Sequence, residues 1–275
     1  MNILFLGDLV GSKVLLYLKK NLKNIIKKYH IEFVIVNGEN LYNGYGIKPE
    51  QANKLFDLGV NVISSGNHIW DQKEIIPYLA RNTNLLKPYN LSVGNAGEGY
   101  GLFSSNSGKK VLVINLMCNL FMKKSENVFD SIKYILARYK LKKNCDAIII
   151  DLHGEAASEK QAMANFIDGQ VSAVIGTHTH VPTSDLRILP YGTAYQTDAG
   201  MCGDYDSVIG GEKNKWIAKF LRKPISDKIN SCCNNITLCG AIIRICLKTG
   251  LSSTAKQIII GSNIENKIPN EEFFL

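Results

Sequence analysis

Residues 173–180 read AVIGTHTH, an apolar run that passes directly into a glycine and two histidines. Small and β-branched apolar residues, as at 173–175, are typical of a buried strand. Four earlier apolar runs also end in polar motifs: residues 3–6 before Gly7-Asp8, 33–36 before Gly38-Glu39-Asn40, 60–63 before Gly66-Asn67-His68, and 148–150 before Leu152-His153-Gly154. The same strand-end pattern is therefore repeated through the first two thirds of the chain.

Helical patterns lie between these runs. Leu15, Leu18 and Leu22 recur at helical spacing, and a second helix is predicted from Pro49, a good first-turn residue, to a stop at Gly59. This alternation of strands and helices predicts an α/β fold with a largely parallel sheet. Because the carboxyl ends of parallel strands lie on one edge of a sheet, the polar motifs should converge in one crevice.

Three segments outside the motifs complete the prediction. Ser158 and Gln161 match a capping box at the start of another helix. Residues 236–260 are typical of strands joined by a hairpin turn at 248–250. Residues 205–228 are expected to form a long loop with one short helix. In this helix Trp216 and Phe220 are four residues apart and should pack on the same face. Stacking of these two rings on nucleic-acid bases is the less favoured interpretation.

Size and composition narrow the class of protein. The chain has 275 residues, of which 45% are hydrophobic and 20% charged, as in ordinary globular proteins. Because it has no internal repeat or proline-rich linker, residues 1–275 are expected to form a single domain. The lysines behind the net charge of +8 are spread over several segments, which favours solvated helix faces over a nucleic-acid-binding stripe.

The same composition predicts a cytoplasmic protein. No run approaches the ~20 apolar residues of a membrane-spanning helix, and Asp8 stands where a signal peptide would need its hydrophobic segment. The chain has seven cysteines, an odd number without paired spacing, which argues against a disulfide framework.

The polar residues at the strand ends are candidates for a metal site. Alone, Asp8 or Glu39 is typical of a helix cap, Asn67 of a turn, and His153 of a structural histidine. Together they would form a costly, mutually unsatisfied cluster unless a cation lay among them. The cluster comprises two carboxylates, two amides and four histidines: Asp8, Glu39, Asn40, Asn67, His68, His153, His178 and His180.

This mixture of donors indicates which metals and which chemistry to expect. Imidazole nitrogen with carboxylate and amide oxygen suits Mn, Fe, Zn or Ni, and the lack of thiolates argues against a purely structural zinc site. The donors outnumber the ligands that one ion needs. Two ions about 3.5 to 4 Å apart, bridged by a carboxylate and a hydroxide, would use them and would suit phosphoester hydrolysis.

The motifs resemble those of the calcineurin-like metallophosphoesterase superfamily. Two departures from its usual pattern stand out: Asp8-Leu9-Val10 lacks the first histidine, and Gly38-Glu39-Asn40 replaces Gly-Asp. The same departures mark the YmdB-like phosphodiesterases, which the chain also resembles at residues 7–11, 37–40 and 197–201. The resemblance runs from residue 2 to about residue 260.

This resemblance implies a four-layer α/β metallophosphoesterase sandwich, in which two mostly parallel or mixed sheets are flanked by helices. It also implies two transition-metal ions at the sheet edge, with Fe or Mn favoured and Zn as the alternative. One ion would be held by Asp8, Glu39, Asn40 and His180, and the other by Glu39, Asn67, His153 and His178.

Carried over from the family, His68 would give a proton to the leaving oxygen or stabilise the phosphoryl charge. Asp71 either orients His68 or caps a helix over residues 72–76, and the cap is the favoured interpretation. Asp198 either supports a ligand or serves the turn before Gly200.

The resulting hypothesis is a dinuclear metal-dependent phosphodiesterase, in which a metal-bridging hydroxide attacks phosphorus and His68 is the general acid. The resemblance points to 2',3'-cyclic nucleotides or short RNA as substrates and to a homo-oligomer. A phosphomonoesterase and a regulatory protein that binds metal or nucleotide with little turnover are the alternatives. The loops that carry the candidate ligands contain no arginine, and the nearest lysines in sequence, Lys13 and Lys48, are expected to face solvent. This lack of fixed cations favours a diester over a monoester dianion as the substrate.

Overall fold

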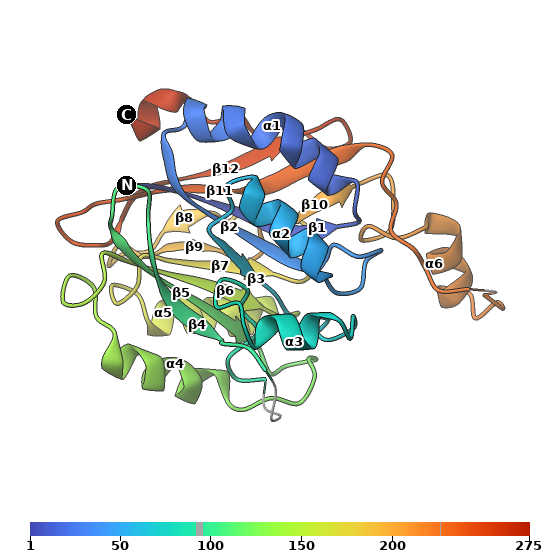
Figure 1. The fold of residues 1–275 in the computed structure, drawn as a ribbon, viewed down its shortest axis with the longest axis horizontal. Helices are drawn as coiled ribbons and strands as arrows, with labels where there is room; N and C mark the ends of the chain where they lie inside the picture. Colours follow the sequence, from blue (N-terminus) through green and yellow to red (C-terminus); the bar gives the residue numbers. More distant parts are fainter. Residues whose placement is uncertain (92–95, 226) are drawn as a thin grey trace.

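The computed structural model describes residues 1–91, 96–225 and 227–275, and contains two six-stranded sheets (Figure 1). The first sheet has the order β12-β11-β10-β1-β2-β3 and the second β4-β5-β6-β7-β9-β8. The strands of the first are β1 (Asn2–Val10), β2 (Ile31–Asn40), β3 (Val62–Ser64), β10 (Met201–Asp204), β11 (Ile236–Ile245) and β12 (Ser252–Ile260). Those of the second are β4 (Tyr100–Ser104), β5 (Lys110–Met117), β6 (Ala147–His153), β7 (Ala173–Thr177), β8 (Arg187–Ile188) and β9 (Ala194–Gln196).

Both sheets are mixed, with a parallel centre. β1 pairs in parallel with β2 and β10, and β2 with β3, whereas β11 and β12 pair antiparallel at one edge. In the second sheet β5, β6, β7 and β9 are parallel, with β4 and β8 antiparallel at its edges. The carboxyl ends of β1, β2, β6 and β7 therefore carry the polar motifs, as predicted.

Most of the helices cover the outer faces of the sheets (Figure 1). The helices are α1 (Val14–Lys28), α2 (Pro49–Asp57), α3 (Ile75–Leu79), α4 (Val128–Arg138), α5 (Ala157–Phe166), α6 (Lys213–Phe220) and a 3-10 helix (Glu271–Phe274). Apolar residues of α1 to α3 share a core with one face of the first sheet, and those of α4 and α5 share a core with the outer face of the second. The predicted four-layer sandwich is thus confirmed, while α6 projects from the body.

The central core forms because successive side chains of a strand point to opposite faces of the sheet. In β1, Leu4 and Leu6 point toward the helices, whereas Ile3 and Phe5 belong to the cluster packed between the two sheets. Val113 of β5 meets them from the second sheet. Strands with apolar residues on both faces read as continuous apolar runs, which is why the sequence revealed them.

Several local predictions were wrong. The strand expected at 60–63 begins only at Val62, and α5 begins at Ala157 after an uncapped Ala156, so Ser158 and Gln161 form no capping box there. The helix near residues 72–76 is α3, whose N-cap is Glu74, and Asp71 is therefore not its cap. Other local predictions were confirmed: α2 begins at Pro49, the C-terminal hairpin forms, and the described residues of 205–228 contain one short helix. Within the described residues no helix is long and apolar enough to span a bilayer.

Candidate metal centre

The predicted ligands meet at the carboxyl edge of the two sheets. Asp8 lies in β1, Glu39 and Asn40 in β2, Asn67 after β3, His153 in β6, and His178 and His180 after β7. The first sheet thus supplies the carboxylates and amides, and the second supplies the imidazoles. The crevice expected from the strand-end motifs is formed between the sheets.

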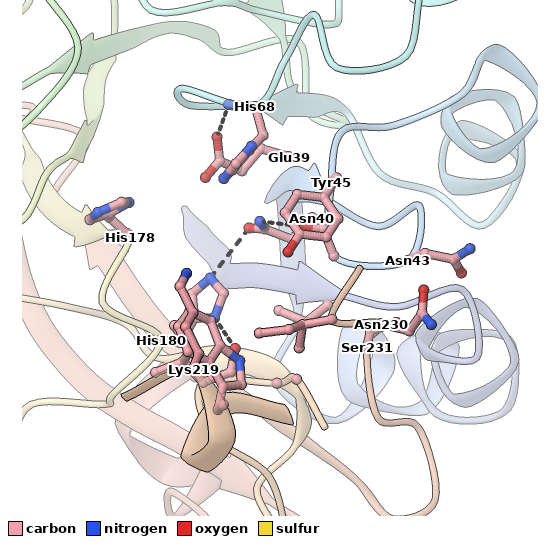
Figure 2. Close-up of a pocket in the computed structure, with 17 residues that line it drawn as sticks. Glu39, Asn40, Asn43, Tyr45, His68, His178, His180, Lys219, Asn230 and Ser231 are labelled. Atoms are coloured by element: carbon pink, nitrogen blue, oxygen red, sulfur yellow. Dashed lines mark hydrogen bonds between the residues drawn. The ribbon is translucent and has the colours of Figure 1, made fainter. Parts of the chain in front are cut away.

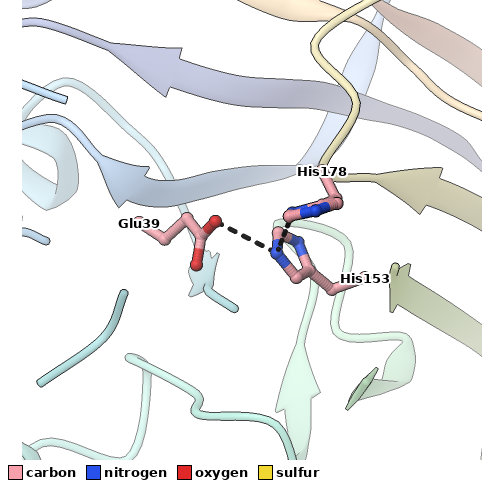
Figure 3. Close-up of side chains that lie close together, drawn as sticks. All are labelled: Glu39, His153 and His178. Carbon is pink, nitrogen blue, oxygen red and sulfur yellow. Dashed lines mark hydrogen bonds and ion pairs between the residues drawn. The ribbon is translucent and has the colours of Figure 1, made fainter. Parts of the chain in front are cut away.

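Three side chains converge on one nitrogen of His153, and Figure 3 shows two of them, Glu39 and His178. Oε1 of Glu39 lies 3.0 Å from Nε2 of His153, and Nδ1 of His178 and Oδ1 of Asn67 each lie 3.1 Å from it. Ligand atoms of Glu39, His153 and His178 all fall within 4.8 Å of one another. An imidazole nitrogen carries at most one hydrogen and cannot satisfy three such neighbours. This convergence of lone pairs is the arrangement that a cation requires.

A chain of hydrogen bonds fixes the tautomer of His153. The Thr177 hydroxyl donates to Oδ1 of Asp151 at 2.6 Å, and its oxygen therefore accepts from Nδ1 of His153 at 2.9 Å. Nδ1 carries the proton, and in the neutral ring Nε2 offers its lone pair to a metal. Asp151 is buried and also accepts hydrogen bonds from Ser64 and Asn37; burial raises its pKa. The supporting roles of Asp151 and Thr177 were not predicted from the sequence.

A second group of donors lies beside the first. Nδ1 of His180 donates to the carbonyl oxygen of Ile209 at 2.7 Å, which leaves its Nε2 3.3 Å from Oδ1 of Asn40 and 4.0 Å from Oδ1 of Asp8. Asp8 is fully buried, its Oδ2 accepts from the backbone N–H of His178, and its Oδ1 has no hydrogen-bond partner. A buried carboxylate oxygen without a donor is costly unless a cation binds it. The residues at this edge therefore fit a metal ion here as well.

Burial and mutual charge shift the pKa values of this cluster. Burial raises the pKa of Asp8 to about 6, although His180 opposes the shift. Burial alone would raise the pKa of Glu39, but His153 outweighs it and the pKa falls to about 2. Burial disfavours the charged form of His153, yet the neighbouring Glu39 raises the pKa of His153 to about 9. Burial and the nearby His153 together lower the pKa of His178 to about 3. Glu39 and His153 thus form a buried ion pair, whose proton a bound metal ion would replace.

His68 lies at the mouth of this cluster rather than within it. Its backbone N–H donates to Oε2 of Glu39 at 2.9 Å, and its Nδ1 lies 2.6 Å from Oδ2 of Asp71. The ring of Tyr45 meets the imidazole edge-on, with 5.4 Å between ring centroids. The less favoured interpretation of Asp71, that it orients His68, agrees with this contact.

Backbone geometry makes room for the ligands. A Cβ on Gly66 would lie 2.2 Å from Nε2 of His153 and 2.4 Å from Oε2 of Glu39, so any side chain here would fill the site. His178 and His180 have φ values of 107° and 66°, in the left-handed region that non-glycine residues rarely occupy. Such strain persists only where surrounding contacts hold it.

A buried ion pair provides that support. The ammonium of Lys160, from α5, donates to the carbonyl oxygen of Thr177 at 2.8 Å and to Oδ2 of Asp198 at 3.2 Å. Asp198 also accepts from the backbone N–H groups of Thr179 and Gly200, each at 2.9 Å. The turn interpretation of Asp198 agrees with its contact to Gly200, and its contact to Thr179 holds the loop that carries the histidines. No pattern in the sequence indicated this role of Lys160.

A cavity of about 290 Å³ opens from the ligand cluster toward α6 (Figure 2). Glu39, Asn40, His68, His178 and His180 form its inner wall. Its outer wall includes Tyr45, Asn43, Trp216, Lys219 and Asn230. The outer wall was not predicted, because residues far apart in the chain form it.

The fold also brings unexpected cations to the site. Lys219 lines the cavity, and the ammonium of Lys123 donates to the carbonyl oxygen of Asn67 at 2.6 Å. Lys48 instead pairs with Glu74 at 3.4 Å. Lys123 and Lys219 come from segments remote from the motifs, so proximity in the sequence could not indicate them.

Comparison with known proteins agrees with this geometry. The YmdB-like protein family matches residues 4–258 of the chain. The chain is 37% identical to the 2',3'-cyclic-nucleotide 2'-phosphodiesterase of Bacillus subtilis over 263 residues, which cover 96% of this chain and 98% of that protein. A crystal structure of a novel phosphatase from Mycoplasma pneumoniae has a TM-score of 0.87 at 33% identity, covering 99% of this chain and 96% of that one. A hypothetical protein from Thermus thermophilus has a TM-score of 0.86 at 33% identity, covering 95% and 99%.

Proposed function

The chain belongs to the YmdB-like protein family of metallophosphoesterases, as its motifs predicted, and we propose that it hydrolyses 2',3'-cyclic nucleotides at a dinuclear metal centre. The observation that carries this proposal is the convergence of carboxylate, amide and imidazole lone pairs around Nε2 of His153. The substrate class is inferred from the name of the Bacillus relative. Short RNA ending in a cyclic phosphate presents the same reacting group.

The two groups of donors suggest which residues hold each ion. Glu39 is buried, contacts His153 of one group and directly precedes Asn40 of the other, and it is the proposed bridge. Iron or manganese suits this donor set, with zinc as the other choice. When bound, the ions would neutralise charge on the phosphoryl oxygens and activate a water molecule. One ion would take Asp8, Asn40 and His180 besides Glu39, and the other Asn67, His153 and His178.

His68 is the proposed general acid. It lines the cavity beside the ligand cluster, and its Nδ1 is engaged by Asp71. The proton given to the leaving oxygen would therefore come from Nε2, while Asp71 holds the ring in position.

A paired hydrolysis assay tests the substrate class. Metal-loaded enzyme should cleave 2',3'-cyclic AMP with a higher kcat/KM than it hydrolyses the nucleoside monophosphate that is released. Glu39→Gln, measured in parallel, controls for a contaminating hydrolase, since it should abolish both activities. Preferential release of inorganic phosphate from the monoester would overturn the diesterase assignment.

A phosphomonoesterase remains the second candidate, because two observations favour it. Lys123 and Lys219 lie near the ligand cluster and could meet the extra charge of a monoester dianion. The structural neighbour from Mycoplasma pneumoniae is described as a phosphatase. The same paired assay separates the two activities.

We also propose a cytoplasmic location and assembly into a homo-oligomer. All seven cysteines are free, as expected for a protein of a reducing compartment. Cell fractionation tests the location, and light scattering of the purified protein tests the assembly.

A further inference from the structure

The cavity beside the ligand cluster is larger than a phosphate group requires. At about 290 Å³ it approaches the lower end of pockets that enclose a whole organic ligand, roughly 300 Å³. It extends from His68 and His178 to α6, which forms the far wall (Figure 2). A phosphate seated among the ligands would leave this outer part of the cavity for the rest of the substrate.

The outer wall combines aromatic and apolar surface with few polar groups. Tyr45 and Trp216 supply the aromatic rings, and Ile229 adds apolar surface. Asn43 and Asn230 add amides that can both donate and accept hydrogen bonds. Such a wall matches a planar, uncharged group with hydrogen-bonding edges, which is the chemistry of a nucleobase.

The charge of the wall argues against a second phosphate as its occupant. Of the described residues that line the cavity, Lys219 alone is a lysine or arginine. Its ammonium lies 4.5 Å from the ring centroid of Trp216, a cation–π contact. Lys219 is thus held against an aromatic face, where it can donate to a carbonyl or ring nitrogen of a base.

Trp216 itself is held in place by its neighbours. Its ring stacks on Phe220 with 5.8 Å between centroids and 22° between planes, which confirms the packing predicted from their spacing. Gly211 lies against the indole, since a Cβ there would be 2.5 Å from Nε1 of Trp216. A fixed aromatic ring loses little conformational freedom when a base packs against it.

We propose that Trp216, Lys219 and Tyr45 form a nucleobase subsite, in which the base packs against the aromatic wall and Lys219 donates a hydrogen bond to its edge. The proposal rests on the proposed function, because it places the phosphate of the same nucleotide at the ligand cluster. In this proposal α6 is the element that recognises the base.

Two cyclic phosphates that differ only in the base provide the first test. The substrates are 2',3'-cyclic AMP and the 2,3-cyclic phosphate of methyl ribofuranoside, assayed with Trp216→Leu and with Ile217→Ala as the matched control. Ile217 is on the same helix, is exposed and does not line the cavity. Trp216→Leu should lower kcat/KM for cyclic AMP by about 5- to 150-fold, mostly through KM, and leave the base-free substrate nearly unchanged. Equal losses on both substrates would overturn the subsite.

A binding measurement tests the subsite without altering it. The chain has two tryptophans, so Trp70→Phe leaves Trp216 as the fluorescent probe; Nε1 of Trp70 has no hydrogen-bond partner to lose. In metal-loaded Trp70→Phe enzyme, 3'-AMP should quench Trp216, whereas inorganic phosphate, which lacks a base, should not. No quenching by 3'-AMP at concentrations that inhibit turnover would overturn the proposal.

The two proposals fail in different ways. If the enzyme hydrolyses neither cyclic phosphate but 3'-AMP still quenches Trp216, the proposed reaction is wrong and the subsite stands. If both substrates are hydrolysed and neither test detects the base, the reaction stands and the subsite is wrong.

Discussion

Replacing Lys160 by methionine should destabilise the protein and loosen the histidine loop. The Lys160 ammonium is fully buried between the carbonyl oxygen of Thr177 and the carboxylate of Asp198. Methionine keeps most of the side-chain length but leaves Asp198 buried without its cation. The backbone N–H groups of Thr179 and Gly200 would then be its remaining partners.

The size of the effect follows from the burial of the pair. Removing one partner of a buried ion pair costs about 3–5 kcal/mol. Unfolding entropy near 2.1 cal/mol/K per residue gives roughly 0.6 kcal/mol/K for a chain of 275 residues. The expected fall in Tm of Lys160→Met is therefore about 5–9 °C.

Calorimetry of three variants checks this reasoning. Lys133→Met, in an exposed pair with Asp130, is the control and should leave Tm nearly unchanged. The double variant Lys160→Met/Asp198→Asn removes both charges and should be more stable than Lys160→Met alone. A fall in Tm of less than about 2 °C in Lys160→Met, or a double variant no more stable than the single one, would refute the supporting role of the pair.

Metal content, catalysis and thiol reactivity give three further predictions. Elemental analysis should find about two transition-metal ions per chain. The Glu39→Gln variant should lose both ions, and His153→Ala should lose mainly one. A fully active protein with one tightly held zinc ion would contradict the dinuclear centre. His68→Ala should keep its metal and lose about 10²- to 10⁴-fold in rate, with partial rescue by a substrate whose leaving group needs less protonation; loss of metal would make His68 a ligand. A hydrogen bond from the backbone of Thr249 lowers the pKa of Cys246, whereas burial raises the pKa of Cys118 to about 12. Iodoacetamide near pH 8, with the products identified by mass spectrometry, should therefore label Cys246 before Cys118. Faster labelling of Cys118 would refute this order.

The sequence predicted the strand ends well because each motif is local. Asp8, Glu39 and His153 directly follow or end apolar runs, and a parallel arrangement is enough to place such residues on one edge. The helix boundaries were less predictable. Ser158 and Gln161 match a capping box that would start the helix at residue 159, but α5 begins two residues earlier, at Ala157.

The supporting residues escaped prediction because their partners are remote in the chain. Lys160 lies 38 residues from Asp198 and looks in sequence like any helix lysine. Its burial depends on the fold, since α5 packs against the second sheet and points this side chain at the loop after β7. The spacing of residues in a single sequence does not distinguish one buried helix lysine from the exposed ones.

The outer wall of the cavity also could not be predicted from the sequence, because its residues come from segments remote in the chain. Trp216 reaches the site because the chain between β10 and β11 leaves the sheet and returns, with Gly211 bridged to both Val208 and Ser231. This excursion brings α6 opposite the strand-end motifs without any change in those motifs. The reacting groups are therefore set by short motifs on the sheet edge, while the surface that would select the substrate comes from an excursion of the chain. Two proteins with the same motifs and different excursions would thus be expected to share the chemistry and differ in the ligands they accept.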